Sequence, residues 1–347
     1  MRAASAPAQH RDQAGPGARA ASVHQGTRRL TGPGASDGRR SWGLVGLLAV
    51  FILLVPPVFV LGPLAGMLLV SRPSSGREWF WLAASGALLA LSLRGNGLAE
   101  GFVRATGVFV AGTFVALSVW NPRGVFRRAV IATVTGLVAA LVLAALLGTG
   151  WESVERALER GLREAFLAQA RVAEASGFGS GVVGALRDMA RSAGESASFY
   201  PALLTVTGIA GCVLGWRWFR LVADRPPALD GEAFAGFRFS DHAVWILIGA
   251  LAITLLPAAD GMLLGATIET WAENVLAVMV ALYIARGLAI FSAASGRTPK
   301  RIVVVLALVG LLLWPFAAGG LLLLGLADSW VDFRRRLESP PTGGRER

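Results

Sequence analysis

Four polar residues stand in or just before one apolar segment of the chain: Glu269, Glu273, Asn274 and Arg286. Glu269 and Glu273 are four residues apart, so in a helix they share a face. An ionisable side chain costs roughly 2.5–3.5 kcal/mol at the centre of a bilayer and commonly marks a functional site. Together these side chains could bind a small polar ligand. Interfacial solvation of the carboxylates is the plainer interpretation, and the functional prediction is a ligand-binding site that faces the interior of a helix bundle.

Sequence signatures of catalysis are missing from the chain. It contains no HExxH, GxSxG, Walker or CxxC motif. Its histidines are His10, His24 and His242, and its one cysteine, Cys212, lies inside an apolar run. A histidine-based triad, a metal cluster and an internal disulfide are therefore not expected. We predict that the protein is not an enzyme and needs no cofactor or metal.

The segments that carry the polar residues are long enough to cross a membrane. Val275–Phe291 contains one charged residue, Arg286, and Ile302–Ala327 contains none. The hydrocarbon core is about 30 Å thick, and a helix rises about 1.5 Å per residue. Only 16% of the residues are charged, against about 25% in soluble domains. The sequence predicts an all-α fold, a polytopic transmembrane helix bundle with eight to ten spans.

Further apolar runs supply the other spans. They are Gly43–Val70, which is broken at Pro56-Pro57 and at Gly62-Pro63, then Trp79–Leu93, Phe102–Trp120, Ala129–Leu147, Phe199–Val222 and His242–Ala259. Many tryptophans lie at or near the ends of these runs, where an amphipathic ring reaches the headgroups. We place the transmembrane domain at residues 43–336.

Residues 151–198 within that domain have a different pattern. Over Trp151–Ala173, apolar residues such as Val154, Leu158 and Leu162 recur at helical spacing, and Glu and Arg fill the other face. We predict amphipathic helices on the extracytoplasmic side. Residues 1–42 contain seven arginines and no apolar periodicity, which predicts a disordered basic cytoplasmic tail. Residues 337–347 are predicted to form a short flexible tail.

The two proline-broken runs, 43–70 and 302–327, decide the topology. If each is a single span and the N-terminus is cytoplasmic, the loops with twelve Lys/Arg lie outside and those with two lie inside, against the positive-inside rule. If each is a hairpin, turning at Pro56-Pro57 and at Pro315–Gly320, the basic loops and both termini become cytoplasmic. The charge pattern favours the hairpins, and single spans with both tails outside are the second choice.

Three stretches carry a family resemblance: VPPVFVLGPLAGMLLVSRPSSG, ENVLAVMVALYIARGLAIF and LGLADSWVDFRRR. They resemble the YybS-like family of bacterial membrane proteins of unknown function (domain of unknown function 2232), over roughly residues 43–336. The resemblance implies a membrane fold similar to the substrate-binding subunits of energy-coupling-factor vitamin transporters. The first span here lacks the Ala-x-x-x-Ala face of those subunits, and Ala83 and Ala87 have that spacing on a later helix.

From these observations we expect an uncharacterised multi-pass protein of the bacterial cytoplasmic (inner) membrane, with both termini cytoplasmic. The first function hypothesis is a small-molecule-binding or transport-related membrane subunit. The alternative is a non-transporting scaffold or regulatory protein of the cell envelope, motivated by the long basic tail. The expected partners are the lipid bilayer and either other membrane proteins or a small-molecule ligand. Nucleic acid is not expected, because the tail lacks interleaved aromatics and any recognisable motif.

Overall fold

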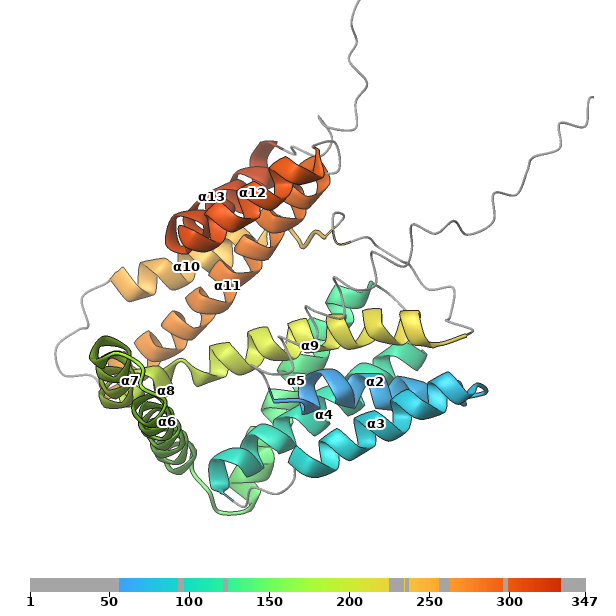
Figure 1. Ribbon diagram of the computed structural model, residues 1–347, viewed down its shortest axis with the longest axis horizontal. Helices are drawn as coiled ribbons and strands as arrows, with labels where there is room; N and C mark the ends of the chain where they lie inside the picture. Colours follow the sequence, from blue (N-terminus) through green and yellow to red (C-terminus); the bar gives the residue numbers. More distant parts are fainter. Residues whose placement is uncertain are drawn as a thin grey trace, which may run out of the picture. The chain divides into compact units, whose positions relative to one another are not determined.

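The computed structural model describes residues 56–92, 97–120, 124–224, 234, 237–255, 263–295 and 299–331 (Figure 1). Within these ranges the regular structure is helical and contains no strand, which confirms the predicted all-α fold. The helices are α2 (Val58–Ser71), α3 (Gly76–Ser92), α4 (Leu98–Trp120), α5 (Val125–Leu146), α6 (Trp151–Ala175), α7 (Ser180–Arg191), α8 (Ala193–Ser198), α9 (Tyr200–Val222), α10 (Ala243–Leu255), α11 (Leu263–Ser295), α12 (Lys300–Leu312) and α13 (Trp314–Val331).

Five of these helices are long and apolar enough to cross a membrane. They are α4, α5, α9, the Ile268–Ser295 part of α11, and α13. Three shorter apolar helices accompany them: α2, α10 and the Arg301–Gly310 part of α12. The predicted polytopic bundle is therefore confirmed. The predicted tails at 1–42 and 337–347, and the first part of the run Gly43–Val70, lie outside the described residues.

The second broken run divides at a different place from the predicted turn. The helix breaks at Leu313, where ψ is 41°, and Pro315–Gly320 lies inside α13. Pro315 is the second residue of α13, a position where the missing N–H of proline leaves no intrahelical bond unmade. The prediction of a turn over Pro315–Gly320 is therefore wrong in position, because proline here begins a helix.

Helix α2 lies against α3, α4 and α9, and one group of fully buried side chains marks its core. Phe59, Leu61 and Leu64 are at most 1% exposed. A Cβ on Gly215 of α9 would lie 2.8 Å from the carbonyl oxygen of Val60, so the glycine allows the backbones of α2 and α9 to meet. Small residues at such positions let membrane helices pack closely.

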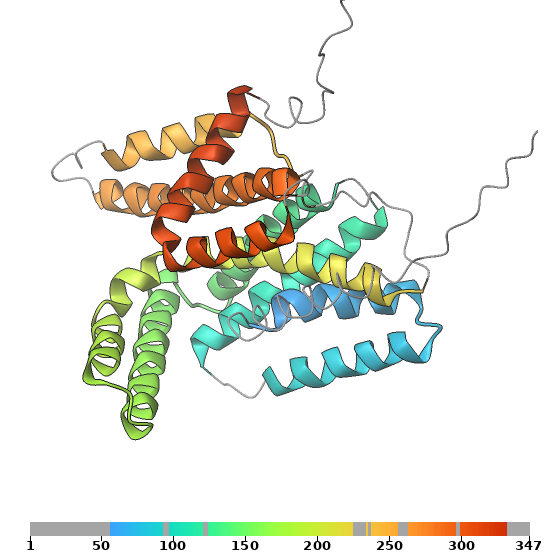
Figure 2. The ribbon, with the colours of Figure 1, turned by 45° about the horizontal axis from the view of Figure 1, so that its top comes forward.

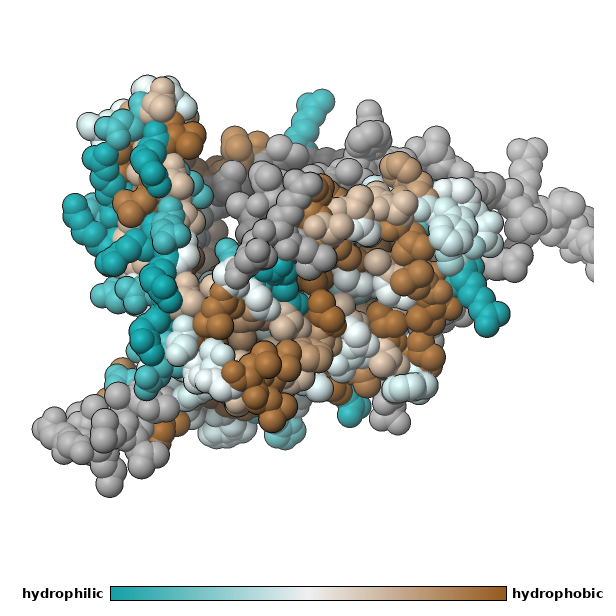
Figure 3. Space-filling model, turned by 90° about the horizontal axis from the view of Figure 1, so that it is seen from below, coloured by the Kyte–Doolittle hydropathy of each residue, from teal (hydrophilic) through white to brown (hydrophobic). Residues whose placement is uncertain are grey.

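The predicted amphipathic helices are present as α6, α7 and α8 (Figure 2). Val154 and Leu158 of α6 are buried in the main core, whereas Ala170 and Ala173 pack with Val183 of α7 in a separate small cluster. Figure 3 shows hydrophilic residues gathered over α6 and α7, beside a neighbouring surface that is largely hydrophobic. The first half of α6 thus belongs to the bundle, and its second half forms a hairpin with α7.

A carboxylate joins the first turn of α3 to the end of α9. Glu78, 4% exposed, accepts hydrogen bonds from the backbone N–H groups of Ser74 (2.7 Å), Ser75 (3.2 Å) and Asp224 (3.0 Å). It lies before the apolar part of α3, and α3 is not one of the five long apolar helices. These hydrogen bonds, that of Ser74 first and that of Asp224 second, lower the pKa of Glu78 below its ordinary 4.5.

We expect the Glu78→Gln variant to unfold more readily at neutral pH, by about 1–3 kcal/mol, because hydrogen bonds to a charged acceptor are lost. A lowered folded-state pKa gives stabilisation that is complete above the ordinary pKa and is lost as the pH falls through the lowered one. The difference between wild type and variant should therefore be largest near about pH 7 and shrink below about pH 4. Thermal unfolding in detergent at several pH values measures it. A difference that grows in acid would contradict this role for Glu78.

Candidate functional site

The four residues predicted to bind a ligand all lie on α11, but the structure does not bring them into one site. Asn274 and Arg286 are twelve residues apart, which is about 18 Å along a helix. Glu269 and Glu273 are partly exposed, whereas Asn274 is 5% and Arg286 is 0% exposed. The two buried residues therefore belong to separate polar contacts, and each is described by itself.

Asn274 joins α11 to the start of α9. Its side-chain oxygen accepts a hydrogen bond from the backbone N–H of Ala202 at 2.9 Å. Its Nδ2 donates to the carbonyl oxygens of Ser198 (2.8 Å) and Thr270 (2.9 Å). Ala202 lies in the first turn of α9, where backbone N–H groups lack intrahelical acceptors. The amide is therefore engaged as a helix cap across the chain, which is a structural role.

The Asn274→Ala variant should be destabilised by about 1–3 kcal/mol, because the buried N–H of Ala202 and the carbonyl oxygen of Ser198 lose the side-chain partner that they have now. Glu273→Ala is the matched control, since its side chain is partly exposed and adjacent in sequence. Its effect should stay within about 0.5 kcal/mol. Denaturant unfolding in detergent compares the two variants. A larger loss for Glu273→Ala than for Asn274→Ala would show that Asn274 is not the cap.

Arg286 forms the second polar contact, between two carboxylates. Its Nε donates to Asp328 Oδ2 at 2.9 Å, and its Nη2 donates to Asp241 Oδ1 at 2.8 Å. The side chains of Arg286 and Asp328 are 0% exposed, and that of Asp241 is 48% exposed. The ring of Phe239 covers the guanidinium, with its centroid 5.4 Å from Cζ. Arg286 is thus a paired charge inside the α10–α11–α13 group.

Two glycines allow this pair to form. A Cβ on Gly325 of α13 would collide with the carbonyl oxygen of Tyr283, and one on Gly287 of α11 would collide with that of Leu321. The two helix backbones are therefore in direct contact at two places within a few residues of Arg286 and Asp328. This closeness lets the short side chain of Asp328 reach Arg286.

Arg286 is recognisable from the sequence as a lone charge, but its partners are not. Asp328 stands near the end of the last apolar run, and a lone acid there is a signal that could have been matched to the lone arginine of the preceding run. Asp241 precedes α10 in a polar loop and has no such signal. Of the other groups nearby, Arg286 Nη1 and the Tyr283 hydroxyl are buried without a hydrogen-bond partner.

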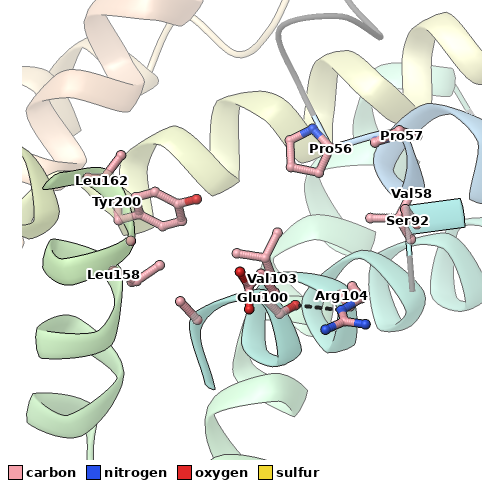
Figure 4. A pocket seen from close by; sticks show the side chains of 12 residues that line it. Pro56, Pro57, Val58, Ser92, Glu100, Val103, Arg104, Leu158, Leu162 and Tyr200 are labelled. Atoms are coloured by element: carbon pink, nitrogen blue, oxygen red, sulfur yellow. Dashed lines mark hydrogen bonds between the residues drawn. The ribbon is translucent and has the colours of Figure 1, made fainter. Parts of the chain in front are cut away.

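A cavity of about 380 Å³ lies elsewhere, among the starts of α2, α4 and α9, the end of α3 and the first half of α6 (Figure 4). Its apolar wall includes Val58, Val103, Leu158 and Leu162, and its polar residues include Glu100, Arg104 and Tyr200. Figure 4 shows the Tyr200 hydroxyl directed into the space between α6 and α4. The Nε of Arg104 donates to the backbone oxygen of Glu100 at 3.1 Å.

The cavity cannot be predicted from a local sequence pattern, because its walls come from five helices that are distant in the chain. Small-molecule sites are commonly concave, mostly apolar and supplied with a few polar groups, in volumes of about 300–1,000 Å³. The cavity fits that description in size and in lining. Arg104 and Glu100 were visible in the sequence only as charges near the start of a span.

The five helices that are long and apolar enough to cross a bilayer define the chain as an integral membrane protein. Residues 44–329 match the family model described as "Predicted membrane protein (DUF2232)", and the chain belongs to this family. No curated protein matches the chain. No solved structure matches it.

Proposed function

We propose that this protein binds a small organic molecule in the cavity between α2, α3, α4, α6 and α9. The observation that carries the proposal is the cavity itself, about 380 Å³ with an apolar wall and the polar groups of Glu100, Arg104 and Tyr200. Such a lining suits a ligand with an apolar body and one hydrogen-bonding or charged end. The proposal assigns binding and not catalysis.

The proposed orientation places the cavity on the extracytoplasmic side of a bacterial inner membrane, with both termini cytoplasmic. Arg72, Arg77, Arg127, Arg217 and Arg220 lie at the helix ends opposite the cavity, and an excess of arginine is typical of the cytoplasmic side. The YybS-like resemblance and its likeness to transporter substrate-binding subunits favour the same placement. A transport-related role would follow if a partner couples release of the ligand to energy.

Filling the cavity tests the proposal. Gly161 lines it, and a Cβ at this position meets nothing within 4 Å, so Gly161→Trp should occupy the space without disturbing α6. Gly184→Trp on α7 is the matched control, because its Cβ also meets nothing within 4 Å and it lies outside the cavity. Both proteins should fold, as judged by thermal unfolding in detergent.

The readout is mass spectrometry of small molecules extracted from the purified protein. Wild type and Gly184→Trp should retain the same molecule, and Gly161→Trp should lose it. Retention by all three would place the ligand elsewhere. Absence of any small molecule together with a stable protein partner would favour the envelope-scaffold alternative.

A further inference from the structure

A second arginine is buried in the bundle, and none of the described residues pairs it with a carboxylate. Arg128 lies in the second turn of α5 and is 3% exposed. Its Cζ is 4.6 Å from the ring centroid of Trp216 on α9 and 5.7 Å from that of Phe114 on α4. The two aromatic rings attract the cation through their faces, but a ring face is no substitute for the oxygen acceptors that a guanidinium fork can use.

Three donors at this place lack an acceptor. Nε and Nη1 of Arg128 and Nε1 of Trp216 are all buried without a hydrogen-bond partner. Arg286, the other buried arginine of the described residues, binds two carboxylates, so the chain does pair a buried guanidinium where it supplies the acids. Buried polar groups in native proteins are almost always paired. Within the part of the chain that the structure describes, the site around Arg128 is therefore short of oxygen acceptors.

The charges around Arg128 favour an anion. Arg127 on α5 and Arg217 and Arg220 on α9 are exposed near the same ends of the helices. The start of α5 adds the partial positive charge of a helix N-terminus. Glu78, which lies against the end of α9, already accepts three backbone N–H bonds. Among the described residues at this end, the arginines Arg77, Arg127, Arg217 and Arg220 outnumber the acids Glu78 and Asp224, so the local field is positive and attracts an anion.

The site lies close enough to the helix ends for a lipid headgroup, or a solute at the membrane surface, to reach it. Phe114 lies six residues before the end of α4, and Trp216 lies six residues before the end of α9. Six residues correspond to about 9 Å of helix. An arginine at that depth can reach the interface, and phosphate oxygens match the guanidinium fork better than a single carbonyl does.

We propose that Arg128 and Trp216 bind a phosphate group at the end of the bundle formed by α4, α5 and α9. The phosphate belongs either to an anionic phospholipid or to a free phosphate ion or ester. Arg128 supplies the charge and two N–H donors, and the indole of Trp216 supplies a third donor. This site is separate from the cavity lined by Tyr200, so the two proposals fail independently.

The test compares Arg128→Gln with its neighbour Arg127→Gln, which removes an equal charge from an exposed position. The full-length proteins are delipidated in neutral detergent and placed in nanodiscs of phosphatidylcholine with or without phosphatidylglycerol. Bound phosphatidylglycerol is counted by native mass spectrometry. We expect Arg128→Gln to bind it about tenfold more weakly than wild type, and Arg127→Gln to stay within about twofold.

A second arm replaces chloride by inorganic phosphate at equal ionic strength, in neutral detergent without lipid. A rise in the unfolding temperature of wild type that Arg128→Gln lacks would identify a free phosphate as the ligand. If only the binding of phosphatidylglycerol depends on Arg128, and the response to inorganic phosphate does not, the ligand is a phospholipid. Equal responses of wild type and Arg128→Gln in both arms, or no response in either, would overturn the proposal.

Trp216→Phe keeps the test decisive if Arg128→Gln does not fold. This change retains an aromatic face for the guanidinium and removes only the indole N–H. We expect phosphate or phosphatidylglycerol to bind about threefold more weakly to Trp216→Phe than to wild type. The comparison uses whichever ligand, phosphatidylglycerol or phosphate, the wild type binds. If Trp216→Phe binds that ligand as tightly as wild type does, the indole is not part of the site and the proposal is overturned.

Discussion

Asp328→Ala should lower the free energy of unfolding by about 3–5 kcal/mol, because it leaves the guanidinium of Arg286 buried and without its fully enclosed partner. Both side chains are 0% exposed, and their Nε–Oδ2 distance is 2.9 Å. The remaining carboxylate, Asp241, is 48% exposed, so water screens its contribution. Thermal and denaturant unfolding of the detergent-purified protein measure the loss.

The double variant Arg286→Met with Asp328→Leu is the decisive companion. Replacing a buried ion pair by apolar residues of similar size is often neutral or stabilising, so the double variant should recover most of the stability lost by Asp328→Ala. Asp241→Asn should have a smaller effect than Asp328→Ala. If the double variant were as unstable as Asp328→Ala, the loss would come from packing and not from an unpaired charge.

Gly325→Val should separate α11 from α13. A Cβ at Gly325 would collide with the carbonyl oxygen of Tyr283 and would lie 3.0 Å from the backbone nitrogen of Gly287. Overpacking of this kind costs about 1–3 kcal/mol, and here it should also lengthen the Arg286–Asp328 contact. Gly319→Val on the same helix is the matched control, because its Cβ meets nothing within 4 Å.

The measurement for this pair of variants is unfolding in detergent, together with crosslinking between cysteines placed on α11 and α13. Gly325→Val should unfold at lower denaturant and crosslink less, and Gly319→Val should resemble wild type. If Gly325→Val kept the wild-type crosslinking yield, the close contact of the two helices would be disproved.

Periodicity and hydropathy predicted the helices of this protein because both depend on neighbouring residues. Runs of apolar residues predict the spans α4, α5 and α9. Apolar residues three and four positions apart predict the amphipathic helix α6. The position of the break was not predicted, because Leu313 lies inside an apolar run and Pro315 stands in the first turn of the next helix and not in a turn between helices.

The candidate sites depended on contacts between residues far apart in the chain. Arg286 was predicted to be important as a lone charge in an apolar run, but its partners are 45 residues before it and 42 residues after it. Asn274 is predicted to bind a ligand, and in the structure its amide also bonds to the start of α9, a contact that no local pattern indicates. The cavity and the Arg128 site combine three or more helices each, and no local pattern specifies which helices meet.

The order of the three charges along the chain has a consequence for biosynthesis. Asp241 is made before Arg286, and Asp328 is made 42 residues after it. At about 5–20 residues per second, Asp328 follows Arg286 by about 2–8 s. When α11 enters the membrane, the acid already available to its arginine is therefore Asp241, which lies just before α10. The exposed carboxylate can accompany the arginine during insertion, and the buried one then completes the pair when α13 arrives.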